Sequence, residues 1–252
     1  MNTSASSPPN AIPFVLAVAA FLFVAAPPSN AQGPRPGEKF MLAVPGMDAV
    51  RIVENQVFAT PADRPLLFDL YTPPGGTSGK LPLVIFVNGI GDTPDFRMRT
   101  HFQYTGWGRL IAASGLAAVN FDVRREHVAE DIDTFLAHLR AHGDEIGIDA
   151  DNMALWSCSA NVREGWALAM SRRPAGVRAA VFYYGNAADT TVRSDLPVQL
   201  VKIELDGQGI NRGIDAAVPR LLRAGTPLDF VVVAGGSHAF DVRDDNEVTR
   251  AV

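Results

Sequence analysis

The sequence has very little cysteine and no concentration of charge of one sign. Cys158 is the single cysteine among 252 residues, so the chain cannot close a disulfide within itself. The net charge at pH 7 is −5 and no run of Lys and Arg occurs, which argues against a nucleic-acid partner. The fold must therefore depend on an apolar core, for which a chain that is 47% hydrophobic is well supplied.

The N-terminal part of the chain also lacks charge. Residues 1–10 contain no Lys or Arg, and residues 11–26 form an uncharged apolar run. A Pro-containing stretch with small residues at Ser29 and Ala31 follows, which is the order found in secretory signals. We predict a signal peptide over 1–31, cleaved near Ala31, and export to the periplasm or the medium without stable membrane association. A retained anchor is the alternative, although the run is short for a span of about 20 residues.

The remainder is long enough for one domain, with an irregular Gly- and Pro-rich lead-in over 32–50 and a folded domain over 51–252. Short apolar runs alternate with amphipathic stretches, which predicts alternating strands and helices. The expected strands are Arg51–Ala59, Leu66–Tyr71, Leu83–Val87, Ala117–Phe121, Met153–Trp156, Arg178–Tyr184, Val198–Leu205 and Leu228–Val233. The expected helices are Thr105–Ser114, Val128–His142, Ala160–Ser171 and Gly213–Arg223. This order predicts an α/β fold with a mainly parallel twisted sheet and helices on both faces.

Reactive residues are expected where strands end, because ligands of such sheets bind at the carboxyl ends of the strands. After the strand Met153–Trp156 the chain runs through Ser157-Cys158-Ser159-Ala160-Asn161 directly into a helix. This turn has the spacing of the nucleophile elbow G-x-S-x-G but lacks both glycines. The spacing predicts Ser159 as the nucleophile, since Cys158 and Ser157 come one and two residues early. A helix-capping role for these serines is the structural alternative.

A histidine and an acid follow in the chain order that this type of site requires, which is Ser, acid, His. His238 lies in a Gly-rich loop after the last predicted strand, and Asp206 ends the strand before it. We predict that Asp206 orients the imidazole of His238, which then acts as the base. Glu204 is the main competitor for the acid, whereas Asp215 and Asp189 are less well placed.

Two glycines flank the candidate for the first oxyanion donor. The segment Asn88-Gly89-Ile90-Gly91 ends the first buried strand. In this architecture one backbone N–H comes from that loop and one from the residue after the nucleophile. We therefore expect the amides of Ile90 and Ala160 to stabilise the oxyanion.

A metal site is not expected. His138 and His142 are four residues apart and share one helix face, but they lack the H-E-x-x-H arrangement and a clear third ligand. A solvated helix face explains them better. No metal and no cofactor is predicted.

Four segments, VNGIGD, WSCSAN, ELDG and GSHAF, together resemble the α/β-hydrolase superfamily over most of residues 50–245. Within it the chain is most similar to small dienelactone-hydrolase-like esterases. The resemblance implies a triad of Ser159, Asp206 and His238 that hydrolyses esters or lactones. The short connection after Tyr184 leaves no room for a large lid domain, as in that subgroup. Two features depart from the pattern, since dienelactone hydrolases use cysteine where this chain has Ser159, and the elbow glycines are missing.

These observations predict a serine hydrolase that cleaves carboxylic esters, with lactones as a related class, through an acyl-enzyme on Ser159. Its partner would be a small-molecule ester. Two alternatives stay open. One is a binding protein that keeps the fold without the chemistry. The other is a hydrolase of a peptide, C–C or C–halide bond, although dehalogenation would use an aspartate as nucleophile.

Overall fold

The computed structural model describes residues 38–252 except 77, 188, 244–246 and 252. The predicted signal peptide therefore lies outside the described residues, as does the first part of the lead-in. The described residues contain an eight-stranded sheet in the order β1-β2-β4-β3-β5-β6-β7-β8. The strands are β1 Arg51–Ala59, β2 Leu66–Thr72, β3 Leu81–Val87, β4 Ala117–Phe121, β5 Ile148–Cys158, β6 Val177–Tyr183, β7 Val198–Ile203 and β8 Leu228–Val233.

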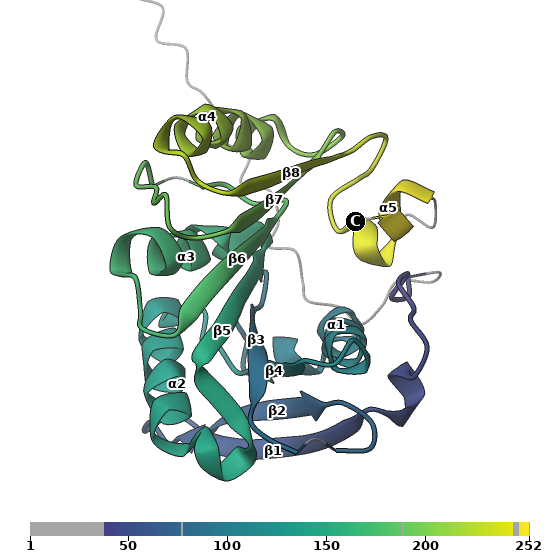
Figure 1. The fold of residues 1–252 in the computed structure, drawn as a ribbon, viewed down its shortest axis with the longest axis vertical. Helices are drawn as coiled ribbons and strands as arrows, with labels where there is room; N and C mark the ends of the chain where they lie inside the picture. Colours follow the sequence, from purple (N-terminus) through teal and green to yellow (C-terminus); the bar gives the residue numbers. More distant parts are fainter. Residues whose placement is uncertain (1–37, 77, 188, 244–246, 252) are drawn as a thin grey trace, which may run out of the picture. The chain divides into compact units, whose positions relative to one another are not determined.

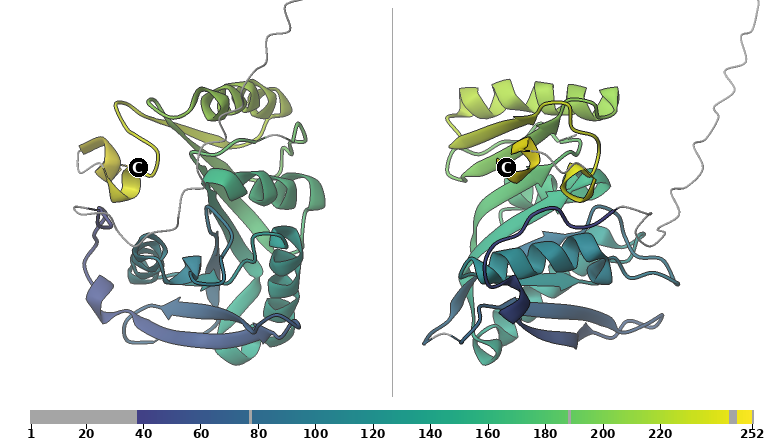
Figure 2. Two further views of the ribbon diagram at one scale, coloured as in Figure 1. Left: turned by 180° about the vertical axis from the view of Figure 1, so that it is seen from behind. Right: turned by 90° about the vertical axis from the view of Figure 1, so that its right-hand side faces the viewer.

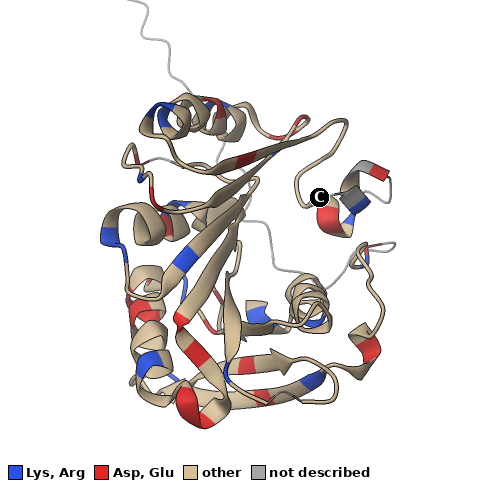
Figure 3. Ribbon diagram, in the orientation of Figure 1, with Lys and Arg blue, Asp and Glu red and all other residues tan. Residues whose placement is uncertain are grey.

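The sheet is mostly parallel. β1 pairs antiparallel with β2, and β2 antiparallel with β4, whereas all later neighbours are parallel. β3 and β4 lie at the centre and carry no charged residue (Figure 3). Strands covered on both faces need such continuous apolar sequences. The carboxyl ends of the parallel strands therefore gather at one edge, where the loops after β3, β5, β7 and β8 meet.

Helices cover both faces. They are α1 Phe102–Ala113, α2 Val128–His142, α3 Val162–Trp166, α4 Gln208–Ala224 and α5 Glu247–Ala251. α1 and α5 lie on one side of the sheet, while α2 and α3 lie on the other, and α4 packs on β7 and β8 (Figures 1 and 2). One hydrophobic core joins the strands to α2, α3 and α4. The predicted fold class is thereby confirmed, and no insertion within the described residues forms a large lid.

Several predicted bounds agree with the structure, and others need correction. The strands Arg51–Ala59, Ala117–Phe121 and Leu228–Val233 and the helix Val128–His142 have the predicted bounds. The helix predicted over Ala160–Ser171 is instead a 3₁₀ turn Ser159–Asn161, then α3, then a π-helical turn Ala167–Arg172.

Two further elements begin five residues earlier than predicted. β5 begins at Ile148 rather than Met153, because the buried Ile148 pairs with Leu81 of β3 ahead of a polar stretch over residues 149–152. α4 begins at Gln208 rather than Gly213, so the glycine lies inside the helix. There it packs against the side chain of Asn186, where a larger residue would collide.

Candidate active site

Ser159 lies on a strained turn between β5 and α3. Its φ is 54°, in the left-handed region that residues with a side chain seldom adopt. The turn ends the strand abruptly and places the serine at the start of the 3₁₀ turn that leads into the helix. Such strain occurs where a fold holds a side chain out of the strand for a functional purpose.

Of the three residues predicted as a triad, Ser159 and Asp206 each lie within hydrogen-bond distance of His238. Ser159 Oγ is 2.9 Å from His238 Nε2, and His238 Nδ1 is 2.9 Å from Asp206 Oδ2. Asp206 follows β7 and His238 follows β8, so the fold brings together residues that are far apart in the sequence. The Asp206 side chain is 5% exposed and that of His238 36% exposed, which leaves the imidazole accessible from one side. The arrangement can pass a proton from the hydroxyl to the imidazole.

The competing acids have other partners. Glu204 accepts a hydrogen bond from the Gly235 amide at 2.7 Å and thereby fixes the turn before the histidine loop. Asp215 pairs with Lys202 on the outside of α4. Asp189 is bonded to Ser171. Of the acids weighed from the sequence, Asp206 is the one that the structure places beside His238.

The competing nucleophiles in the same turn are buried. Cys158 is 1% exposed, its Sγ is 3.5 Å from Tyr104 Oη, and burial raises the pKa of its thiol to about 12. A thiol with so high a pKa holds almost no reactive thiolate at neutral pH. Ser157 is fully buried and points toward α3. Of the candidate nucleophiles in this turn, Ser159 is therefore the one that a substrate can reach.

The structure also shows how the turn does without the two usual glycines. Ser157 faces Gly165 of α3, where an added Cβ would overlap the serine side chain, so the small residue has moved to the helix. On the other side Gly185 makes room for Val162. Gly165 and Gly185 lie outside the turn, and the local sequence pattern of the turn does not indicate them.

Asn161, the larger residue of the turn, has a specific partner. Its buried side-chain amide donates to the backbone carbonyl of Asn88 at 2.6 Å. The Asn88 side chain in turn donates to the carbonyl of Phe121 at 3.2 Å. Asn161 thus ties the nucleophile turn to the loop after β3, a function that a glycine could not perform.

The two predicted oxyanion donors lie in different surroundings. Ala160 lines the cavity beside Ser159. Ile90 is half-buried in the loop after β3 and is not among the residues that line this cavity. The loop nevertheless approaches the turn closely, since a Cβ on Gly89 would lie 3.1 Å from Ser159 Cβ. The Gly89 amide already donates to Tyr104 Oη at 2.7 Å. The donor roles of Ile90 and Ala160 stay predictions.

The cavity at Ser159 has a volume of about 560 Å³ and is open to solvent. Its wall combines the triad and Ala160 with Arg163, Asn186 and Ile210. Within the described part of the chain no group of three or more His, Cys, Asp or Glu is arranged to hold a metal ion. The rings of His138 and His142 lie 4.9 Å apart, and His142 is bonded to Glu145. None of the described helices combines the length and apolar character that crossing a bilayer requires.

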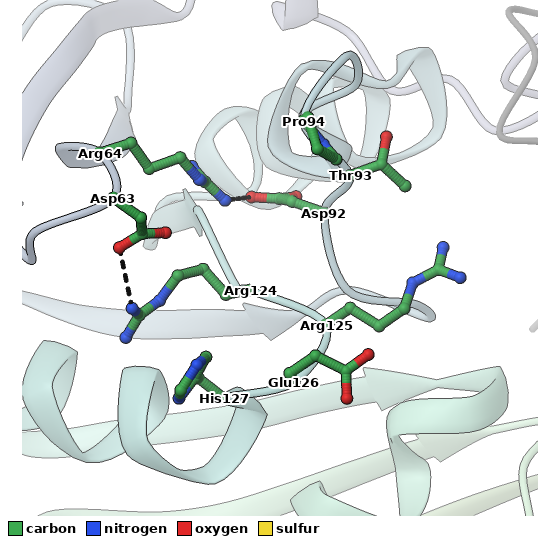
Figure 4. A pocket seen from close by; sticks show the side chains of 9 residues that line it. All are labelled: Asp63, Arg64, Asp92, Thr93, Pro94, Arg124, Arg125, Glu126 and His127. Atoms are coloured by element: carbon green, nitrogen blue, oxygen red, sulfur yellow. Dashed lines mark hydrogen bonds and ion pairs between the residues drawn. The ribbon is translucent and has the colours of Figure 1, made fainter.

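A second cavity, of about 540 Å³, lies at the loops after β3 and β4. Figure 4 shows Arg64 bonded to Asp92 on one side of it and Arg124 bonded to Asp63 on the other. Both guanidinium groups thus already have carboxylate partners. Residues 124–127 form much of the remaining wall.

The strand order, the strained serine turn and a histidine after the last strand together define the α/β-hydrolase fold. No family model and no curated protein matches the chain. Solved structures do match. A bacterial heroin esterase is 17% identical, with 81% of each chain covered and a TM-score of 0.63. Thermogutta terrifontis esterase 2 is 15% identical over 81% of this chain and 89% of the other, with a TM-score of 0.62.

A Klebsiella pneumoniae protein assigned as a dienelactone hydrolase is also similar. It is 18% identical over 81% of this chain and 94% of the other, with a TM-score of 0.61. At these identities the likeness establishes the fold. What the chain does must be argued from its own site.

Proposed function

We propose that this protein is a serine hydrolase that cleaves carboxylic esters through an acyl-enzyme on Ser159. The observation that carries the proposal is the continuous relay from Ser159 Oγ to His238 and Asp206, with both contacts at 2.9 Å and the serine on a strained turn. The esterase activity of the similar solved structures supports the same class of reaction.

The chemistry follows from the geometry. Asp206 accepts a hydrogen bond from the Nδ1–H of His238, which leaves the Nε2 lone pair directed at the Ser159 hydroxyl. The serine attacks the ester carbonyl while the imidazole takes its proton, and the amides of Ile90 and Ala160 donate to the developing oxyanion. The imidazolium then protonates the leaving alcohol, and water releases the acid by the same steps. Lactones would react in the same way, with the alcohol retained on the product.

The open cavity of about 560 Å³ favours small esters over long acyl chains. The binding-protein alternative was motivated by the two missing elbow glycines. That motivation is weakened because Gly165 and Gly185 supply the space that the turn itself does not.

The experiment is fluorophosphonate labelling of the purified chain, read by intact mass and peptide mapping. We expect one adduct, on Ser159, with p-nitrophenyl acetate hydrolysed by the same preparation. Ser159→Ala should abolish both signals, and His238→Ala should slow labelling at least a hundredfold. Ser157→Ala is the matched control, because it removes a serine of the same turn that is buried. An unlabelled wild-type chain that also leaves the acetate untouched would support the binding protein instead.

Export belongs to the same proposal. A chain cleaved after Ala31 would keep the complete catalytic domain, because all triad residues lie far beyond the cut. N-terminal sequencing of the protein recovered from periplasm and medium tests this. A mature chain that begins at Gln32 is the expected result, and a chain that retains residues 1–31 in a membrane fraction would favour the anchor.

A further inference from the structure

Behind the candidate histidine lies a buried carboxylate that the proposed chemistry does not use. Asp241 follows His238 by three residues and is 0% exposed. Its Oδ2 accepts from Gln103 Nε2 and Trp107 Nε1, each at 2.8 Å, and its Oδ1 accepts from Tyr184 Oη at 2.9 Å. The Gln103 amide also donates to Tyr184 Oη at 2.7 Å. Burial raises the pKa of this carboxyl, while these three donors oppose the rise.

The three donors come from two parts of the fold. Gln103 and Trp107 lie on α1, four residues apart and hence on one helix face, and Tyr184 follows β6. The indole N–H and the amide NH₂ can only donate, so the group between them must accept. A carboxylate satisfies all three donors at once, whereas an apolar residue would leave the Trp107 indole and the Tyr184 hydroxyl buried without this acceptor and the Gln103 amide with Tyr184 alone.

The N-terminal segment holds the same loop from another direction. The Met41 amide donates to the Asp241 carbonyl at 3.0 Å. Arg243 pairs with Glu38 at 3.0 Å and donates to the carbonyl of His238, also at 3.0 Å. Asp241 and Arg243 are therefore bonded to the N-terminal segment, to α1 and to Tyr184.

The network reaches the imidazole itself through Tyr184. The tyrosine ring contacts the His238 ring edge-on, with 4.9 Å between centroids. The backbone is strained on both sides of this contact, since φ is 39° at Tyr184 and 62° at Ala239. Strained residues of this kind persist where surrounding contacts hold them in place. The hydrogen bond between Tyr184 and Asp241 links the strained residue after β6 to the loop that contains Ala239.

We propose that Asp241 is a positioning residue for the reaction: its carboxylate, clamped by Gln103, Trp107 and Tyr184, holds the loop so that His238 meets Ser159 and Asp206 together. The proposal rests on the proposed function of His238. It assigns Asp241 no contact with substrate.

The test compares Asp241→Asn with Asp69→Asn. Asp69 is a matched control, since it is also a buried carboxylate, bonded to Arg99 and to the Asn55 amide, but remote from the triad. For Asp241→Asn we expect kcat and the rate of fluorophosphonate labelling to fall at least tenfold per folded molecule, with KM within twofold of wild type. Asp69→Asn should lose stability and keep both rates.

A second measurement separates positioning from general loosening. The proton shared by His238 and Asp206 should give a low-field imidazole N–H resonance in ¹H NMR spectra of the wild-type chain and of Asp69→Asn. In Asp241→Asn this resonance should broaden or vanish. Tyr184→Phe, which keeps the ring and removes one bond to Asp241, should show a smaller change in the same direction and serves if Asp241→Asn does not fold.

Wild-type rates and an unchanged resonance in Asp241→Asn would overturn the proposal. A wild-type chain that resists labelling would overturn the proposed function instead, and the resonance would then still decide whether Asp241 positions the imidazole.

Discussion

The described residues contain two buried polar networks that hold their carboxylates in different ways. The ion-pair network beside β2 and β4 consists of Arg64, Arg99, Asp69, Asp92 and Asp122, in which guanidinium groups bond directly to carboxylates. The Asp241 network consists of Asp241, Gln103, Trp107 and Tyr184, in which one carboxylate is held by neutral donors. In the first network each carboxylate is bonded to a guanidinium, and in the second the carboxylate is bonded to neutral donors.

The difference has a physical reason in the proposed reaction. In the proposed reaction His238 becomes positive when it takes the serine proton, and an unpaired guanidinium close behind it would oppose that step. The guanidinium of Arg243, which donates to the His238 carbonyl, is paired with Glu38. The donors that hold Asp241 are neutral. In the ion-pair network no such constraint applies, so charge pairing can serve stability alone.

The backbone differs between the two regions as well. Asn55, which is bonded to Arg99, has a φ of 58°, but asparagine adopts this region more readily than most residues. Around the Asp241 network the positive φ values belong to Ser159, Tyr184 and Ala239, for which they are unusual. Strain is thus concentrated where the proposed chemistry occurs. The comparison predicts that substitutions near the triad change activity, and substitutions in the ion-pair network change stability.

The largest effect on activity is expected from a substitution of the proposed nucleophile. Ser159→Ala should lower kcat for p-nitrophenyl acetate by about 10⁴-fold or more, because the nucleophile is lost. The free energy of unfolding should stay within about 1 kcal/mol of wild type, since a half-buried hydroxyl is removed. Steady-state kinetics and urea denaturation measure the two quantities. A rate of hydrolysis within tenfold of wild type would show that Ser159 is not the nucleophile.

Arg99→Met tests the ion-pair network beside β2 and β4. The substitution leaves the buried Asp69 without a guanidinium partner and Asp122 with Arg64 alone, which should lower the free energy of unfolding by about 3–5 kcal/mol. The rate of hydrolysis per folded molecule should stay within twofold of wild type. Urea denaturation gives the first value, and active-site titration corrects the second. Arg51→Met, at an exposed arginine, is the control and should change stability by less than about 0.5 kcal/mol.

Gly165→Ala tests whether a small residue on the helix α3 compensates for the glycine that the serine turn lacks. The new methyl group would overlap Ser157, so α3 must shift, at a cost of about 1–3 kcal/mol. Because Ser159 begins the same segment, kcat should fall as well. Adding Ser157→Gly should restore part of both losses, as a double-mutant cycle followed by thermal denaturation would show. Purely additive effects would mean that the two residues do not share this space.

The smallest expected effect is a pH dependence within the ion-pair network. Burial, helped by the nearby Asp122 carboxylate, raises the pKa of Asp92 to about 6 from its ordinary value of 3.8. Between these values the folded chain binds a proton that the unfolded chain does not, so the contribution of Asp92 to stability grows as the pH falls through 6. The difference in unfolding free energy between wild type and Asp92→Asn should therefore shift by about 1 kcal/mol in favour of wild type between pH 7 and pH 5.

Urea denaturation at several pH values measures this shift. Asp95→Asn, at an exposed aspartate of the same loop, is the control, and its difference from wild type should be nearly constant with pH. A constant difference for Asp92→Asn too would show that this carboxyl titrates normally.

Much of the fold could be predicted because the relevant signals are local. Continuous apolar runs such as Leu83–Val87 and Ala117–Phe121 indicate buried parallel strands wherever they occur. The alternation of strands and helices then limits the topology to a few forms. Since the carboxyl ends of parallel strands share one edge, the positions of Ser159, Asp206 and His238 at strand ends predicted that they would lie close together, and the structure places them so.

The supporting residues could not be predicted in the same way, because each depends on a partner far away in the sequence. Gly165 relieves Ser157 across a helix–strand contact, and Asn161 reaches the carbonyl of Asn88. Asp241 looks like an ordinary loop aspartate until Gln103 and Trp107 are placed around it. The positive φ of Ser159 likewise belongs to the packed structure and not to the residue.

The sequence by itself thus determined the class of fold, because hydrophobic periodicity and the order of elements along the chain are local signals, and it predicted which side chains meet at the carboxyl edge of the sheet. Only the tertiary structure decided how that edge is held. The packing of distant segments determines which glycines give space to the serine turn and which buried carboxylates are bonded to arginines. It also determines that the carboxylate behind the histidine is bonded to neutral donors.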